Sequence, residues 1–111
     1  MEAQALFDIL ADPTRRRILA LLLARDELCV CELTTALEEI QPKISRHLGV
    51  MKGAGLVTSR REGTWMHYRM AKLPSWTAAL LGPLATGAVP EFKADMKRLK
   101  IVSGRAQRCA D

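Results

Sequence analysis

The sequence predicts one mainly α-helical domain with a single small β-hairpin, an α+β fold. The chain has 111 residues, a length that suits one domain with one core. Hydrophobic residues make up 49% of it, which favours a folded globule over a disordered tail. They recur at helical spacing through most of the chain, but one segment with β-branched and aromatic residues instead flanks a glycine turn.

Two helices are expected at the N-terminus. Residues 2–11 place their apolar side chains on one stripe, as in an amphipathic helix. Asp12 is a suitable N-cap and Pro13 suits the first helical position, so a second helix is expected over about 13–25. The arginines at 15–17 open this helix, where cations are unfavourable for the helix dipole. They therefore predict either an external anion or a solvated face.

The next two predicted helices are short and close together. One is expected over about 30–38, and the other begins near Pro42 and runs to about Ala54, where Gly55 can end it in a left-handed conformation. Two short helices joined by a tight connection have the layout of a helix-turn-helix, here over about 30–54.

A β-hairpin is expected over about 56–70, around a turn at 62–64. A hairpin directly after a helix-turn-helix is a wing, so the predicted architecture is a winged helix-turn-helix. Further helices are expected over about 75–103, with a break or kink at Gly82-Pro83.

The helices expected at the two ends of the chain indicate that it forms a dimer. Apolar helices at both ends of so small a domain need a cover, so we expect a homodimer formed through the N- and C-terminal helices. Residues 1–104 are predicted to form the single domain and 105–111 a flexible tail.

The charge and the ends of the chain indicate a compartment and a partner class. The net charge of +5 favours an anionic partner, most commonly nucleic acid, although a basic surface without such a partner is the alternative. The sequence has no run of about 18 apolar residues, so no membrane partner is expected.

The N-terminus lacks the layout of a secretory signal, which predicts a cytoplasmic protein. Structural disulfides are not expected there.

The second helix of a helix-turn-helix reads base edges with its N-terminal residues. Side chains that reach bases or phosphates occur at or near the start of that predicted helix: Gln41, Lys43, Ser45, Arg46 and His47. The wing adds three candidates for backbone or minor-groove contact: Arg60, Arg61 and Arg69. Each one alone is equally compatible with a solvated surface role, but the cluster on the helix favours binding to double-stranded DNA.

Cys29 and Cys31 are either two small buried hydrophobes or a binding site for a soft, thiophilic centre. Residues i and i+2 on an α-helix point roughly 200° apart, so two sulfurs there cannot easily hold one ion. A centre bound by both would require the first turn of the third helix to unwind or to stay non-helical. Such a change in the third helix would connect binding of the ligand to release of DNA.

Four segments closely resemble the ArsR-type (ArsR/SmtB) winged-helix repressors, and within that family the arsenic-responsive ones. They are residues 28–33 (LCVCEL), 41–48 (QPKISRHL), 55–57 (GLV) and 63–69 (GTWMHYR), and the resemblance extends over about 3–73. It implies a cytoplasmic homodimer, not an enzyme, that needs no cofactor. Such a dimer binds operator DNA without its inducer and releases it on binding trivalent arsenic or antimony. Ser45 and His47 match positions that the family uses for DNA contact.

The chain departs from the family pattern in two places. Where the arsenic site often has a third cysteine, this chain has Thr34, so the third ligand is Cys109, a small cellular thiol, or absent. Where the family often has a capping serine, this chain has Ile40, which loses a hydrogen bond typically worth about 1 kcal/mol. The family's zinc and nickel site on the C-terminal helix is not expected, because no histidine follows His67.

Three alternatives remain open from the sequence. The same thiols on the same scaffold suit a sensor of cadmium, lead or oxidants. A dithiol redox enzyme is a different class, but no βαβ pattern surrounds the cysteine pair. The third is a sequence-independent architectural DNA binder.

Overall fold

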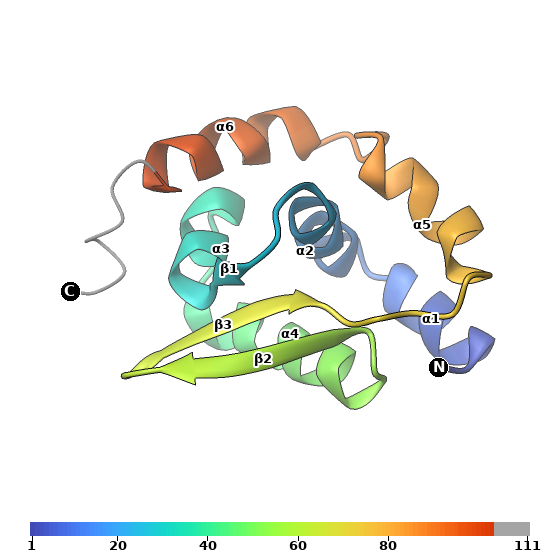
Figure 1. Cartoon of the computed structure of the whole chain (residues 1–111). Helices are drawn as coiled ribbons and strands as arrows, with labels where there is room; N and C mark the ends of the chain where they lie inside the picture. The colour runs from blue at the N-terminus through green and yellow to red at the C-terminus, as the bar shows by residue number, and fades with distance from the viewer. Residues whose placement is uncertain (104–111) are drawn as a thin grey trace.

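The computed structural model describes residues 1–103, so Cys109 and the predicted tail at 105–111 lie outside the described residues. Within them the chain forms six helices and one three-stranded antiparallel sheet, and the predicted α+β winged helix-turn-helix is confirmed (Figure 1). The elements are α1 (Ala3–Leu10), α2 (Pro13–Ala24), β1 (Leu28–Cys29), α3 (Val30–Leu37), α4 (Gln41–Gly53), β2 (Val57–Glu62), β3 (Trp65–Met70), α5 (Thr77–Ala85) and α6 (Phe92–Ser103). No helix in this part of the chain has the length and hydropathy needed to cross a bilayer.

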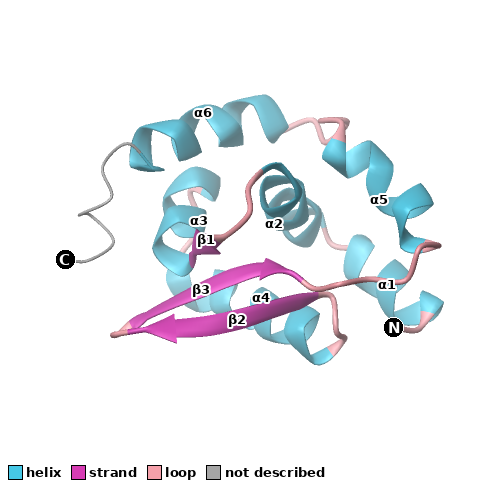
Figure 2. Ribbon diagram, viewed as in Figure 1, coloured by secondary structure: helices cyan, strands magenta, loops and turns pink. Residues whose placement is uncertain are grey.

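Helix α2 lies at the centre of the fold (Figure 1). Helix α6 crosses one side of α2 and α3, and the β2–β3 hairpin lies on the opposite side beside α4. Figure 2 shows the hairpin as an arm whose tip extends beyond the helices. Fully buried side chains from α2, α3, α4 and α6 form one core, including Leu19, Leu33, Leu48 and Leu99. Burial of each such side chain contributes about 1.5–3 kcal/mol, so the helix-turn-helix is held by this core.

Strand β1 is an element that the sequence did not predict. Its two residues pair with β3, Leu28 opposite Tyr68 and Cys29 opposite His67. A strand of two residues is too short to show an alternating pattern, so its sequence carries no periodic signal. Because of this pairing, Cys29 belongs to the sheet and lies just before α3.

The expected break at Gly82-Pro83 is wrong, since α5 continues through both residues to Ala85. Proline lacks the N–H that would bond one turn back, but it removes only one such bond. Leu81 and Leu84 are both buried, and their packing holds this short helix together.

The arginines at 15–17 each donate a hydrogen bond to another group of the protein, a role that the sequence did not predict. Arg16 Nη1 donates a hydrogen bond to the Leu10 carbonyl at 2.6 Å. Arg17 forms an ion pair with Asp95 of α6, 78 residues away in sequence. The third, Arg15, bonds an imidazole of α4, described below.

Arg17, Asp95 and Arg98 form a buried group that we call the Asp95 cluster. The Asp95 carboxylate is 0% exposed and accepts two hydrogen bonds from Arg17, at 2.8 and 2.9 Å, and one from Arg98 at 2.7 Å. The same guanidinium groups donate to the last carbonyls of α3, Arg98 to Ala36 at 2.7 Å and Arg17 to Leu37 at 3.0 Å. These carbonyls have no partner within the helix, so the cluster caps α3 and ties its end to α6.

Candidate nucleic-acid interface and cysteine site

Helix α4 has a buried face and an exposed face. Ile44, Leu48 and Met51 are fully buried against the core. Three of the predicted DNA-binding side chains are exposed on the other side: Gln41, Ser45 and Arg46. The helix starts after Ile40, which makes no side-chain cap, as expected from its sequence. The start of α4 thus presents polar side chains together with backbone N–H groups that no side chain caps.

Lys43, a fourth predicted contact, is half-buried and is paired with a residue of the connection that precedes α4. Its Nζ lies 3.0 Å from Glu39 Oε2, one helical turn earlier. A partly exposed pair of this kind is weak, so the ammonium group can exchange the carboxylate for a phosphate at little cost.

His47 lies apart from the other predicted residues of α4. It is only 6% exposed and lies between α4 and the start of α2. Arg15 Nε donates a hydrogen bond to His47 Nδ1 at 3.1 Å, and His47 Nε2 lies 3.9 Å from Asp12 Oδ1. This side chain therefore joins the recognition helix to α2.

Burial lowers the pKa of His47, and the nearby Arg15 guanidinium adds to the effect. Asp12 acts in the opposite direction, but its carboxylate is too distant to outweigh burial. Since Nδ1 accepts the bond from Arg15, the ring is neutral with its proton on Nε2. Protonation of Nδ1 would break this bond and place two cations together.

Acidification from pH 7.5 to 5.5 is therefore expected to lower the free energy of unfolding. Below pH about 6.5 the unfolded chain binds a proton that the folded His47 does not yet accept, so this part of the stability is lost as pH falls toward the folded pKa. Urea unfolding across this range measures the effect. The His47→Gln variant, whose amide oxygen can still accept from Arg15, should show a flatter profile. An equally steep profile in that variant would assign the titration to another group.

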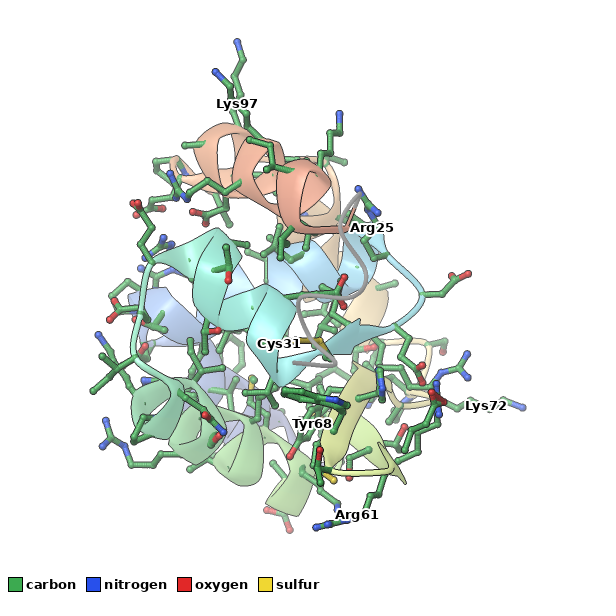
Figure 3. All side chains as sticks on the ribbon, turned by 90° about the vertical axis from the view of Figure 1, so that its left-hand side faces the viewer. Arg25, Cys31, Arg61, Tyr68, Lys72 and Lys97 are labelled. Atoms are coloured by element: carbon green, nitrogen blue, oxygen red, sulfur yellow. A yellow bond between two sulfur atoms is a disulfide. The ribbon has the colours of Figure 1, made fainter. Side chains whose placement is uncertain are left out.

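The three wing arginines differ in their surroundings. Arg60 is held by Glu27 at 2.6 Å and by Glu62 at 2.9 Å. The bond from Arg60 lowers the pKa of Glu27 below its usual value. Arg61 and Arg69 are exposed, and Figure 3 shows Arg61 pointing away from the body of the molecule. The wing thus offers two exposed cations and a third that is already paired.

Cys29 and Cys31 lie at the start of α3. Cys29 is its N-cap and Cys31 its second residue, with Cα atoms 5.4 Å apart. The structure joins the two sulfur atoms in a disulfide, which corrects the expectation that no structural disulfide forms. Cys29 Sγ also accepts the Glu32 N–H at 3.4 Å, and the Glu32 carboxylate accepts the Cys29 N–H at 2.9 Å, so the pair forms a capping box.

The two sulfurs meet without any unwinding of α3, because the backbone at Cys29 is non-helical, which is one of the two arrangements that the sequence predicted. Cys29 has extended backbone angles, φ −85° and ψ 160°, and stands outside the helix, so the angle between successive helical residues does not apply. Thr34, at the position of the family's third cysteine, donates its hydroxyl to the Cys31 carbonyl at 2.8 Å. Residues 1–103 contain no group of three or more His, Cys, Asp or Glu side chains that could hold a metal ion.

A cavity of about 180 Å³ lies beside Cys31, between α3, the start of α4 and the wing. Its walls include Cys31 and Thr34 of α3, Gln41 and Ser45 of α4, and Trp65 and Tyr68 of β3. Figure 3 shows Cys31 at the near end of α3, next to the Tyr68 ring. The sequence carried no signal for this cavity, because its walls come from three elements that only the fold brings together.

The fold and these surfaces define a class of protein. A helix-turn-helix with exposed polar side chains at the start of its second helix, followed by a basic hairpin, is a winged helix-turn-helix DNA-binding regulator. The model of the bacterial regulatory protein, arsR family, matches residues 12–59. The chain belongs to this family.

The family assignment also rests on relatives that match two thirds or more of the chain. An arsenic resistance transcriptional regulator of Pseudomonas putida is 43% identical over 104 residues, 92% of this chain and 90% of that protein. The arsenical resistance operon repressor of Escherichia coli is 51% identical over 77 residues, 68% of this chain and 66% of that protein, just under two thirds. The crystal structure of the AntR antimony-specific transcriptional repressor superposes with a TM-score of 0.62 at 27% identity, covering 82% of this chain and 78% of that one. The chain is therefore a DNA-binding transcriptional regulator rather than a dithiol redox enzyme.

Proposed function

We propose that the chain is a cytoplasmic, homodimeric repressor that binds operator DNA and releases it when trivalent arsenic or antimony bonds to Cys29 and Cys31. The observation that carries this proposal is the position of the two adjacent sulfurs at the N-cap of α3, the helix that supports α4. The names of the relatives, which are arsenical and antimony-specific repressors, agree with it.

The DNA contacts divide by exposure. Gln41, Ser45 and Arg46 would face base edges and phosphates in the major groove, and the exposed wing arginines would contact the backbone. Lys43 and Arg60 would first exchange their carboxylate partners for phosphates. His47 would set the angle of α4 through Arg15 rather than contact DNA. The uncapped N–H groups after Ile40 suit a phosphate as well.

A second copy of the chain is the proposed cover for apolar side chains on the terminal helices. Phe7 of α1 is 53% exposed and Ile101 of α6 is 54% exposed. Their burial in an interface would remove this apolar surface from water. Two copies related by a two-fold axis would present two recognition helices to paired half-sites.

Inducer binding starts from the dithiol form, which small cellular thiols produce by reducing the disulfide. Two thiols then displace two hydroxyl groups of arsenous acid, so two As–S bonds form and two waters leave without any change in oxidation state. The third arsenic bond would keep a hydroxyl group, or pass to Cys109 or a small thiol.

The proposed link from inducer to DNA is the capping sulfur. In this structure Cys29 Sγ accepts the Glu32 N–H, and Cys29 pairs with His67 of the wing. The proposed DNA-binding dithiol form would keep both contacts. A sulfur bonded to arsenic is a weaker and displaced acceptor, so the start of α3 and the adjoining wing strand would rearrange. The inducer shifts the equilibrium only by its differential affinity for the two forms.

A sensor of oxidants is a second candidate, because the structure holds the two cysteines as a disulfide. In that function an oxidant would take two electrons from the dithiol, and the disulfide form would differ from the dithiol form in DNA affinity. Cadmium and lead are further thiophilic centres that the same thiols suit.

The test uses the reduced chain and an operator selected from a random DNA library. Binding is followed by fluorescence anisotropy at fixed salt, because DNA affinity depends steeply on ionic strength. We expect micromolar arsenite or antimonite to weaken binding at least tenfold. Release by cadmium, lead or peroxide, with arsenite inactive, would overturn the proposed inducer. Equal affinity for selected and random DNA would overturn specific repression.

A further inference from the structure

We infer that the cavity beside Cys31 receives the organic group of a monosubstituted trivalent arsenical, such as an arylarsenical, bonded to Cys29 and Cys31. The chain would then distinguish organic arsenicals from inorganic arsenite by the contents of this cavity. The inference rests on the proposed function, since it assumes that arsenic bonds to these two sulfurs.

The direction of the third arsenic bond follows from the burial of the two cysteines. Cys29 is 2% exposed and takes no part in lining the cavity, whereas Cys31 is half-buried and forms part of its wall. Cys31 is the more open of the two, so an arsenic atom bonded to both sulfurs would project its third substituent on the side of Cys31. That side is the cavity.

The chemistry of the third position favours a carbon substituent. The Thr34 hydroxyl donates to the Cys31 carbonyl, so it is engaged with its own helix. In residues 1–103 no group of three or more His, Cys, Asp or Glu side chains could surround the atom. An arsenical that already carries one As–C bond needs only two thiolates, and this is the number that the start of α3 supplies.

The cavity also has the right size and walls for an aromatic ring. A dry cavity of about 150 Å³ is known to accept benzene, and this one measures about 180 Å³. Trp65, Met66 and Tyr68 provide apolar and aromatic surface along the wing side. The remaining wall is polar and belongs to α3 and α4, so the ring would lie against the wing.

Occupation of the cavity would reach the DNA-reading side chains directly. Gln41 and Ser45 line it and are also exposed at the start of α4, where the proposed function places base contacts. A ring that contacts these two side chains would compete with DNA for their positions. Release would then not depend on the capping sulfur alone.

The bonding step balances without a further oxidant or reductant once the dithiol is present. A hydrated arylarsine oxide carries one As–C bond and two As–OH groups. Two thiols replace the two hydroxyl groups, two waters leave, and the As–C bond remains intact. Reduction of the disulfide beforehand uses two equivalents of a small thiol, which leave as their own disulfide.

The test measures arsenical binding in a Trp76→Phe background, so that Trp65 on the cavity wall is the one tryptophan that fluoresces. Phenylarsine oxide and arsenite are titrated into the reduced full chain. We expect phenylarsine oxide to bind at least tenfold more tightly. A Thr34→Leu change fills the cavity and should reduce phenylarsine oxide affinity about tenfold while arsenite affinity stays within twofold. Thr35→Leu, exposed on the same helix, is the matched control and should change neither.

Nuclear Overhauser contacts between the phenyl protons and the Trp65 indole give a readout that does not depend on the variant. Equal affinity for the two probes, an equal loss of both in Thr34→Leu, or absence of the Overhauser contacts would overturn the inference. If arsenite binds and releases DNA in those cases, the proposed function stands without it. If neither probe binds, the proposed function fails as well. The preference should persist in Cys109→Ser, because the inference rests on Cys29, Cys31 and the cavity alone.

Discussion

Replacement of Asp95 by alanine is expected to lower the free energy of unfolding by about 3–5 kcal/mol. The carboxylate is fully buried and accepts three hydrogen bonds from the guanidinium groups of Arg17 and Arg98. Its removal leaves two like charges close together, one of them on a side chain only 15% exposed. The loss is large because an uncompensated charge stays buried. Urea unfolding at neutral pH measures it.

Two further variants separate burial of charge from loss of packing. Asp26→Ala removes an exposed carboxylate and should change the free energy of unfolding by less than about 0.5 kcal/mol. The double change Arg17→Met with Asp95→Leu replaces the ion pair by apolar groups and should recover much of the loss, since it leaves only Arg98, which is 30% exposed. A loss below about 1 kcal/mol in Asp95→Ala would contradict the described role of the Asp95 cluster.

The second large effect concerns the response to arsenic. The Cys29→Ser chain is expected to bind operator normally but to require at least a hundredfold more arsenite for release. Serine is a preferred N-cap and preserves the capping box with Glu32, so the fold is kept or slightly stabilised. Its hydroxyl does not form the sulfur bond that holds arsenic, and one thiolate remains where two are needed. Operator release followed by anisotropy measures the effect.

Cys29→Ala is the matched control for the cap. It removes both the sulfur and the acceptor for the Glu32 N–H, so it should lose the arsenic response and, in addition, about 1 kcal/mol of stability. Unchanged release of Cys29→Ser at the wild-type arsenite concentration would contradict the assignment of this sulfur to the inducer site.

Local patterns predicted the elements that have long, regular signals. Apolar spacing indicated the helices, and the glycine turn indicated the wing. The apolar spacing of α4 also indicates that His47 is buried, a point that the prediction did not use. Ile44, His47, Leu48 and Met51 occupy positions i, i+3, i+4 and i+7, so the histidine belongs to the inner stripe of α4. Its side-chain chemistry and its match to a DNA-contact position of the family both group it instead with the DNA-facing residues.

Other features depend on contacts between distant parts of the chain. The partner of Arg17 lies 78 residues away on α6, and no local pattern relates the two. The two-residue strand before α3 forms only because β3 is present to pair with it, and that strand brings the cysteines together outside the helix. The cavity beside Cys31 similarly requires three elements at once. The sequence thus indicated candidate residues for the site but not how they are arranged.

The Asp95 cluster has a consequence for how two copies of the chain would span DNA. It fastens the end of α3 to α6, and α6 also carries the exposed apolar surface proposed to face a second copy. In each copy, α6 would therefore connect the two-fold axis of the dimer rigidly to the helix-turn-helix. A rigid connection would fix the distance between the two copies of α4 near one helical repeat of the duplex, about 34–36 Å. The operator would then tolerate changes within its half-sites better than a change in the number of base pairs between them.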